Sequence, residues 1–277
     1  SRLFAPTIRS LLFFNNHESY QPTVTDIPFL VAIKLVKVLD LSQLNLGSTF
    51  PREIELLVHL RYLAVVGDLE SIASSMSNLL NLETLILETF DSAVSLPDSI
   101  WNLKKLRHLV LKGDCLDEYC ELQLPTYNLE NAEHLCDLNT LYRVMLPSWD
   151  TIDKMFRKFP NIHKLKCSFY EANGSRDSAD KVLALDFLSG LESLTLKFIN
   201  HTGVQCQFEF QFPLTIRKLT LSGFLFPWSK ISEIQNLPNL AVLKLLDGAF
   251  QGKIWNMEEE EEGFPKVSFL KLASLDI

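Results

Sequence analysis

The chain has 277 residues, of which 47% are hydrophobic, and a formal net charge of -8 at pH 7. This acidic balance argues against a dedicated nucleic-acid-binding protein, because neutralising a phosphate backbone requires an excess of Lys and Arg. No apolar run approaches the length of a membrane span, so direct insertion into a membrane is not expected.

The segment Leu-x-x-Leu-x-Leu recurs along the chain and predicts its architecture. The middle leucines of the eleven copies are Leu11, Leu39, Leu63, Leu85, Leu109, Leu141, Leu165, Leu194, Leu219, Leu243 and Leu270. Most steps between them fall within the period of a leucine-rich repeat, which is about 20 to 29 residues. We therefore predict eleven short parallel strands stacked in chain order, with the leucines in a shared core and the intervening residues facing solvent.

Between the early strands, the sequence indicates short turns or helices on the opposite side of the repeat. The ranges 50–57 and 96–103 place Pro51 and Pro97 where the chain turns, and apolar residues follow at helical spacing. The range 72–79 keeps this spacing but has Ala73 at the proline position. We expect the missing proline to weaken that turn and to leave the register of the strands intact.

Two long steps and one irregular strand interrupt the repeat. The polar ranges 114–120 and 171–180 predict insertions that loop out. Near Leu141, Arg143 stands where the last leucine belongs and Val144 follows one place late, so we expect a kink or bulge there. The run Glu258–Glu262 predicts a solvated loop, because like charges repel one another.

Together these patterns predict an α/β solenoid, an arc of about eleven leucine-rich repeats. We expect short parallel strands on its concave face and loops, 3-10 turns or short helices on its convex face. Residues 1–277 are expected to form a single domain. The first residue is not methionine and no polar capping repeat follows the last strand, so we interpret the chain as a fragment of a longer protein.

The cysteines and the glycosylation triplets point to different compartments. Five cysteines are scattered along the chain, and Cys167 occupies a leucine position, where a reduced thiol acts as a small hydrophobe. We infer a reducing compartment. The triplets that begin at Asn173 and Asn200 are glycosylation acceptors in a secreted protein, so a secreted protein is the alternative.

No set of residues has the spacing of a catalytic or metal site. The six histidines are dispersed, and the spacing of His134 and Cys136 relative to Cys115 and Cys120 matches no recognised zinc pattern. We therefore expect no enzyme activity, no metal and no cofactor in this chain.

Basic residues outnumber acidic ones among the exposed strand positions and the residues that flank them. The candidate interaction residues are Arg9, Lys37, Asp40, Arg61, Arg107, Lys112, Lys164, Lys166, Lys197, Arg217, Lys218 and Lys244, and Lys271 continues the pattern. This excess predicts a positive concave face that docks an acidic partner. The alternative is that these side chains only cover apolar surface with their stems.

Several motifs occur together that resemble a known plant family. They are Ile8–Phe14, Val38–Leu41, Phe50–Ile54, Leu96–Leu103, Lys158–Ile162, Pro227–Ile231 and Leu237–Leu240. As a set they resemble the repeat domain of plant intracellular nucleotide-binding, leucine-rich-repeat immune receptors of the coiled-coil type. The resemblance is to the solanaceous group that includes late-blight resistance proteins and helper receptors, and it covers nearly the full chain.

The resemblance implies a cytoplasmic receptor with an upstream coiled coil and an ATP/ADP-binding switch module, neither present in this chain. In that family the repeat domain folds back on the switch and keeps it inactive. In some members it also recognises pathogen proteins or partner receptors, which triggers defence and cell death, and activated helpers assemble at membranes.

We assign the fold-back contact to Arg9, Lys37, Asp40, Arg61 and Arg107. An external ligand is assigned to a second cluster, Lys164, Lys166, Arg217 and Lys218. The alternatives to a receptor of this kind are a secreted leucine-rich-repeat ectodomain or enzyme inhibitor and a ubiquitin-ligase substrate adaptor.

Overall fold

The computed structural model describes residues 7–14, 27–90, 93–112, 120–127, 129–146, 149–170, 181–199, 208–252 and 264–275. The expected insertion at 171–180, both glycosylation triplets and the run Glu258–Glu262 lie outside these ranges, and of the expected insertion at 114–120 only Cys120 lies within them. The chain divides into two compact units. Unit 1 is Ser1–Met145 with Arg157–Phe159, and unit 2 is Leu146–Phe156 with Pro160–Ile277. That 1–277 forms a single domain stays a prediction.

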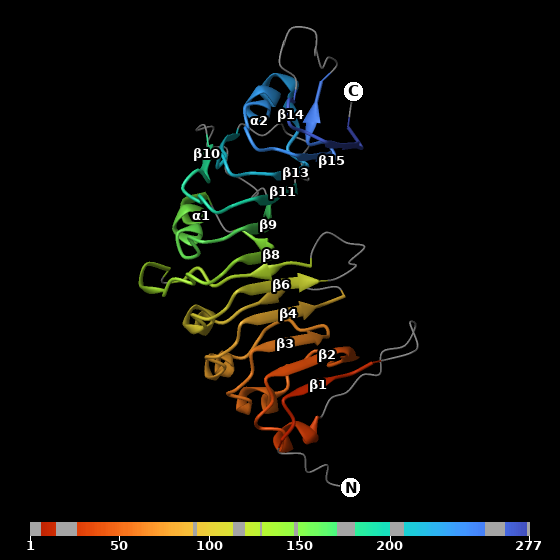
Figure 1. Ribbon diagram of the computed structural model, residues 1–277, viewed down its shortest axis with the longest axis vertical. Helices are drawn as coiled ribbons and strands as arrows, with labels where there is room; N and C mark the ends of the chain where they lie inside the picture. The colour runs from red at the N-terminus through yellow and green to blue at the C-terminus, as the bar shows by residue number, and fades with distance from the viewer. Residues whose placement is uncertain are drawn as a thin grey trace. The chain divides into compact units, whose positions relative to one another are not determined.

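Six parallel strands form the sheet of unit 1 and lie side by side in chain order (Figure 1). They are β1 (Ser10–Leu12), β2 (Val38–Asn45), β3 (Tyr62–Val66), β4 (Thr84–Glu88), β6 (His108–Lys112) and β8 (Thr140–Met145). The predicted middle leucines pair in register from Leu11 through Leu39 and onward to Leu141. From Leu39 to Leu141 these leucines are buried, which makes them the core of the unit.

Five parallel strands form the sheet of unit 2, again in chain order (Figure 1). They are β9 (Lys164–Tyr170), β11 (Ser193–Ile199), β13 (Lys218–Ser222), β15 (Val242–Leu246) and β17 (Phe269–Ala273). Leu165, Leu194, Leu219, Leu243 and Leu270 are in register. All eleven predicted strands are therefore confirmed, and so is their register within each unit.

The backbone position just before each strand ties neighbouring repeats together. The carbonyl of Arg9 accepts hydrogen bonds from the N–H groups of Lys37 (2.7 Å) and Val38 (3.1 Å). The same pair of hydrogen bonds to one carbonyl recurs at the equivalent position of the other repeats. These carbonyls belong to Lys37, Arg61, Glu83 and Arg107 in unit 1 and to His163, Glu192, Arg217 and Ala241 in unit 2. We call these positions the leading row of each unit, which satisfies the polar backbone where each repeat turns into its strand.

Short 3-10 helices stack on the other side of unit 1 (Figure 1). They are η1 (Pro28–Ala32), η2 (Arg52–Leu56), η3 (Ser74–Asn78) and η4 (Asp98–Asn102), with η5 (Leu129–Asn131) further along the chain. The residues that precede η2, η3 and η4 have the same extended conformation, with φ of -66° at Pro51, -65° at Ala73 and -74° at Pro97. The predicted turns are confirmed, and Ala73 adopts the proline conformation without the ring.

The predicted irregularity at Arg143 is a change of strand partner. The pairing of β8 with β6 ends at Tyr142, and Arg143 has a positive φ of 60°. Val144 then pairs with Leu122 in β7 (Leu122–Gln123), which itself pairs with β5 (Val94–Ser95). Val144 is fully buried. The bulge at Arg143 therefore lets Val144 occupy the core position that the last leucine of the motif fills in other repeats.

Unit 2 has helices and small two-stranded sheets on the side away from its main sheet. The helices are α1 (Trp149–Phe156), η6 (Trp228–Ile231) and α2 (Ser232–Gln235). The sheets pair β10 (Lys181–Ala184) with β12 (Phe208–Gln211) and β14 (Phe226–Pro227) with β16 (Phe250–Gln251).

Aromatic rings fill the core of unit 2 beneath its main sheet. The Phe224 ring centroid lies 5.1 Å from that of Phe226, 5.4 Å from Phe210 and 5.7 Å from Phe198. Phe226 continues the contact to Phe250 at 5.8 Å. Such offset and edge-to-face pairs add to the free energy gained by burying the rings.

The cysteines depart in part from the expectation of a reduced set. Cys167 is buried at its leucine position, as expected. Cys120, however, is disulfide-bonded. Disulfides persist mainly in oxidising compartments, so this bond does not favour a reducing one, and the cellular location stays a prediction. Within the described ranges, no helix is long and apolar enough to cross a membrane.

Candidate interaction surfaces

The sheet of unit 1 has a mixed face with half-buried apolar and aromatic side chains at its centre. Residues on either side of each middle leucine lie on the side of the sheet opposite that leucine because side chains alternate along a strand, and Ala64 and Thr140 are the buried positions among them. Two rows cross the strands, namely Ser10, Val38, Tyr62, Thr84, His108 and Thr140, and then Leu12, Asp40, Ala64, Ile86, Val110 and Tyr142. We call these rows, with Glu88 and Lys112 beyond them, the unit 1 face.

The candidate residues Arg9, Lys37, Arg61 and Arg107 are exposed but belong to the leading row, one residue before each strand. They border the unit 1 face instead of covering it. The charged residues of the unit 1 face itself are Asp40, Glu88 and Lys112 among the described positions, so the predicted cations lie at its border and a positive docking surface stays a prediction. The reason is geometric, since the first intervening residue of Leu-x-x-Leu-x-Leu comes before the chain turns into the strand.

The leading row of unit 1 holds an ion pair between neighbouring repeats. The Arg61 guanidinium lies 3.2 Å from the Glu83 carboxylate. The two side chains are 57% and 33% exposed, so solvent screens the attraction. Glu83 thus interrupts the basic row between Arg61 and Arg107.

Asp40 is held by its own strand and faces a tyrosine on the next one. Its Oδ1 accepts hydrogen bonds from the Ser42 backbone N–H at 3.0 Å and the Ser42 hydroxyl at 2.6 Å. Partial burial, and then the negative charge of Asp40, raise the pKa of Tyr62 above its ordinary value. Burial also raises the pKa of Tyr142. Both phenols are therefore neutral, half-buried groups that offer ring surface and one hydroxyl.

The sheet of unit 2 exposes a different face, rich in lysine. Three rows cross its strands and make up the unit 2 face. The rows are Lys164, Ser193, Lys218, Val242 and Phe269, then Lys166, Thr195, Thr220, Lys244 and Lys271, then Ser168, Lys197, Ser222, Leu246 and Ala273. Each strand contributes at least one of the six lysines, and none of these fifteen positions is acidic.

Two acidic residues lie near the ends of these strands without entering the face. Glu192 is exposed in the leading row, beside Arg217. Asp247 follows β15 and accepts a hydrogen bond from the Ser222 hydroxyl at 3.2 Å. Of the predicted second cluster, Lys164, Lys166 and Lys218 lie on the unit 2 face, and Arg217 lies just before it.

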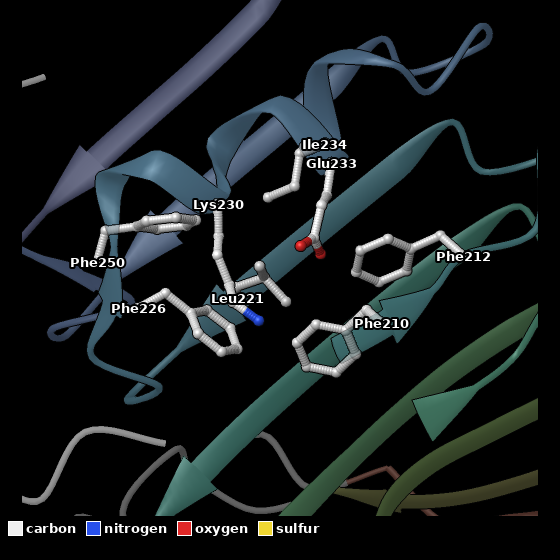
Figure 2. A pocket seen from close by; sticks show the side chains of 8 residues that line it. All are labelled: Phe210, Phe212, Leu221, Phe226, Lys230, Glu233, Ile234 and Phe250. Carbon is white, nitrogen blue, oxygen red and sulfur yellow. The ribbon is translucent and has the colours of Figure 1, made fainter. Parts of the chain in front are cut away.

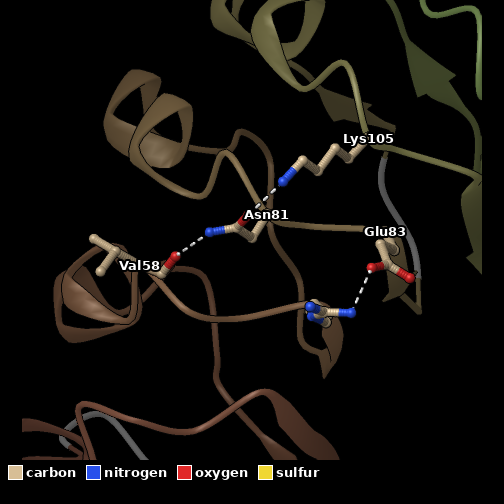
Figure 3. A network of polar contacts seen from close by, with 5 residues as sticks. Val58, Asn81, Glu83 and Lys105 are labelled. Carbon is tan, nitrogen blue, oxygen red and sulfur yellow. Dashed lines mark hydrogen bonds and ion pairs between the residues drawn. The ribbon is translucent and has the colours of Figure 1, made fainter.

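A side-chain network connects three successive repeats of unit 1 at their turns. Asn81 Nδ2 donates to the carbonyl of Val58 at 3.1 Å, and Lys105 Nζ donates to Asn81 Oδ1 at 2.7 Å (Figure 3). Asn239 repeats the first bond in unit 2, where it donates to the carbonyl of Leu214 at 2.9 Å. These contacts fix the stacking of repeats and are not aimed at a ligand.

A pocket lies on the helical side of unit 2, between α2, η6 and β12. Its volume is about 10 Å³, roughly that of one water-sized sphere. Its lining residues are Phe210, Phe212, Leu221, Phe226, Lys230, Glu233, Ile234 and Phe250 (Figure 2). Lys230 Nζ lies 5.9 Å from the Phe226 ring centroid, so the pocket has its own cation over an aromatic face.

Burial raises the pKa of the Glu233 carboxyl at this pocket, while Lys230 opposes the shift and Glu209 adds to it. Neither this site nor the aromatic centre of the unit 1 face was singled out from sequence. The phenylalanines at 208, 210, 212, 224 and 226 were the available signal for the pocket. Within the described residues, no group of three or more His, Cys, Asp or Glu could hold a metal ion.

Comparisons with known proteins agree with this architecture. A family model described as leucine-rich repeat region matches residues 7–248. Among solved structures, the crystal structure of a TDR receptor aligns with 96% of this chain and 44% of that chain, at a TM-score of 0.53 and 17% sequence identity. The structural likeness concerns the fold alone.

Curated relatives come from Solanum demissum. One putative late blight resistance protein homolog is 34% identical over 248 residues, which is 88% of this chain and 30% of the relative. A second such homolog is 31% identical over 271 residues, which is 94% of this chain and 21% of the relative. The chain thus spans less than a third of the length of these relatives.

Proposed function

The chain belongs to the leucine-rich repeat region family, and on that premise we propose that it is the repeat domain of a plant disease-resistance receptor. We propose further that it works by binding proteins and not by catalysis. The similarity to late blight resistance homologs over most of the chain supports the first statement. Two broad exposed sheet faces of different chemistry support the second, because extended sheet surfaces are what repeat proteins use for recognition.

The rest of such a receptor lies beyond this chain. Under this proposal, an ATP/ADP-binding switch and a coiled coil precede the repeats, and the receptor is cytoplasmic. Its partners are the switch module within the same molecule and pathogen proteins or partner receptors from outside. The repeat domain restrains the switch until a partner binds, and release of the switch starts defence and cell death.

The unit 1 face is the surface we assign to the switch module, and its composition carries the assignment. Half-exposed Tyr62, Ile86, Val110 and Tyr142 occupy its centre. The leading-row cations border it on one side. An apolar and aromatic centre with a charged rim is the usual anatomy of a protein interface.

A charge reversal in the full-length receptor tests the assignment. Lys37→Glu/Arg107→Glu changes two exposed rim cations, and it avoids Arg61, which is already paired with Glu83. Opposite charge at the rim should weaken the restraint and cause cell death in leaves without any pathogen. The control Lys34→Glu/Arg52→Glu makes the same change in net charge at exposed positions outside the face. If the Lys37→Glu/Arg107→Glu receptor accumulates normally and causes no cell death, that result would count against an autoinhibitory contact.

A second candidate function is a secreted leucine-rich-repeat ectodomain or enzyme inhibitor, and the disulfide at Cys120 is the observation that favours it. Disulfides persist mainly in oxidising compartments. Protein isolated from its natural source decides between the two. Glycans on Asn173 or Asn200 together with an intact disulfide would support the secreted protein, whereas unmodified asparagines and reduced cysteines would support the cytoplasmic receptor.

A further inference from the structure

We propose that the unit 2 face binds an acidic protein segment that lies in an extended conformation across strands β9, β11, β13, β15 and β17. This inference rests on the proposed role of the chain as a protein-interaction domain and adds the chemistry of one partner. It is independent of the contact assigned to the unit 1 face, which lies in the other unit.

The lysines form a grid that matches an extended chain. Neighbouring strands lie about 4.8 Å apart, so five strands span roughly 20 Å, the length of about six residues in extended conformation. The lysines occur on successive strands as Lys164 and Lys166 on β9, Lys197 on β11, Lys218 on β13, Lys244 on β15 and Lys271 on β17. A carboxylate-rich segment that crosses the strands therefore meets a cation on every strand.

The positions between the lysines also suit carboxylates. Ser193, Thr195 and Thr220 lie on the same rows and carry hydroxyl groups that can donate hydrogen bonds. Lys164, Lys218 and Lys271 form no ion pair within the described residues. No acidic residue stands at any of the fifteen positions of the three rows.

Lys244 shows how the face holds its cations in place. Its Nζ lies 5.9 Å from the ring centroid of Phe269 on the neighbouring strand. The ring attracts the ammonium group and leaves its outer side open to a partner. Part of the entropy cost of ordering this side chain is therefore met before the partner binds.

A nucleic acid fits this surface less well than an acidic protein segment. Single-stranded nucleic acids bind through aromatic side chains that stack on successive bases, and Phe269 is the one aromatic residue on the three rows. The net charge of -8 for the whole chain also repels a long polyanion, whereas a short acidic segment feels mainly the local lysines.

Binding of a fluorescein-labelled octaglutamate peptide to the 277-residue chain, followed by fluorescence anisotropy, tests the inference. The variant Lys166→Glu/Lys244→Glu reverses two lysines of the central row. The control Lys34→Glu/Lys266→Glu makes the same change in net charge at exposed turn positions outside both faces. Thermal unfolding of each variant, followed by circular dichroism, verifies that it is folded.

We expect the face variant to bind the peptide at least about tenfold more weakly than the wild type, and the control to stay within about twofold. Binding should also weaken as salt is raised. Equal peptide affinity of the face variant and the control would overturn the inference. So would tighter binding of a labelled oligothymidine of matched charge that depends on the same two lysines, because the ligand would then be a nucleic acid.

The same two variants in the full-length receptor separate this inference from the proposed function. Loss of peptide binding together with an unchanged defence response would uphold the acidic-ligand surface and contradict a receptor role for this face. Peptide binding that survives in the face variant contradicts the inference whatever the receptor does.

Discussion

Gly223 packs against the backbone carbonyl of Phe198 so closely that a Cβ at Gly223 would overlap the carbonyl oxygen. Gly223 also has a positive φ of 81°, a conformation that residues with a Cβ rarely adopt. The two residues come directly after Lys197 and Ser222, which pair with each other on β11 and β13. The missing side chain therefore lets two consecutive repeats approach each other at the end of the sheet.

Replacing this glycine should destabilise the fold strongly. We expect Gly223→Ala to lower the free energy of unfolding by about 2–4 kcal/mol, because it adds left-handed strain to a steric overlap with backbone. Urea denaturation at neutral pH measures the change. Gly190→Ala is the matched control, since a Cβ there would be 3.4 Å from a His163 side-chain carbon and should cost less than about 1 kcal/mol. Equal losses at the two sites would contradict the packing argument.

The aromatic core of unit 2 should depend strongly on Phe224. This ring is fully buried and contacts Phe198, Phe210 and Phe226. Phe224→Ala should therefore cost about 3–5 kcal/mol, and Phe224→Leu clearly less, because leucine refills part of the cavity. Leu214→Ala, at a position that is 67% exposed, should change stability by less than about 0.5 kcal/mol. Thermal unfolding of the three variants would show whether this order holds.

The strands were predictable because their signal is repeated. A single Leu-x-x-Leu-x-Leu segment is a weak pattern, but eleven copies at a near-constant period favour one parallel register, and it buries the middle leucines from Leu39 to Leu243. The bulge at Arg143 was predictable for the same reason, since a residue that breaks a strict register has to be accommodated locally. Val144, the residue after the position of the last leucine, is buried in the core in place of that leucine.

The interaction surfaces were less predictable because their chemistry depends on where each strand begins. The positions of basic residues within the repeat motif predicted that Arg107 and Lys164 lie on one kind of surface. In the structure, Arg107 precedes its strand, whereas Lys164 lies on its strand. A shift of one residue changes which side of the sheet a side chain occupies. The pocket at Glu233 was out of reach for a further reason, because it is assembled from segments that the repeat pattern does not describe.

Asn81 should contribute to the stability of unit 1 through its two hydrogen bonds to neighbouring repeats. Asn81→Ala removes both and should cost about 1 kcal/mol, the usual net value for partly exposed hydrogen bonds. Asn81→Asp keeps an acceptor for Lys105 and loses the donor to Val58, so its cost should be intermediate. Lys105→Met in the Asn81→Ala background measures the coupling by a double-mutant cycle. A Lys105→Met effect that is the same in both backgrounds would show that the bond to Lys105 contributes nothing.

Glu233 should make the stability of unit 2 depend on pH in a direction fixed by its pKa. Burial raises the pKa of this carboxyl above the ordinary value of 4.5, so the folded state disfavours its charged form. A group whose pKa is raised in the folded state contributes stability below the unfolded pKa, and it loses that contribution as the pH rises through the folded pKa. Glu233→Gln, which stays neutral, should therefore be more stable than the wild type at pH 7. The difference should shrink as the pH falls below 4.5.

Lys230 sharpens this prediction because its charge opposes the shift at Glu233. Lys230→Met removes the opposing charge and should raise the pKa of Glu233 further, which enlarges the gain from Glu233→Gln at pH 7. Urea denaturation of the single and double variants across this pH range measures both effects, with Glu70→Gln as the control for removing an exposed carboxylate from unit 1. A Glu233→Gln variant that is less stable than the wild type at pH 7 would mean that the charged carboxylate is favoured in the pocket by its contact with Lys230, and that burial is the weaker influence.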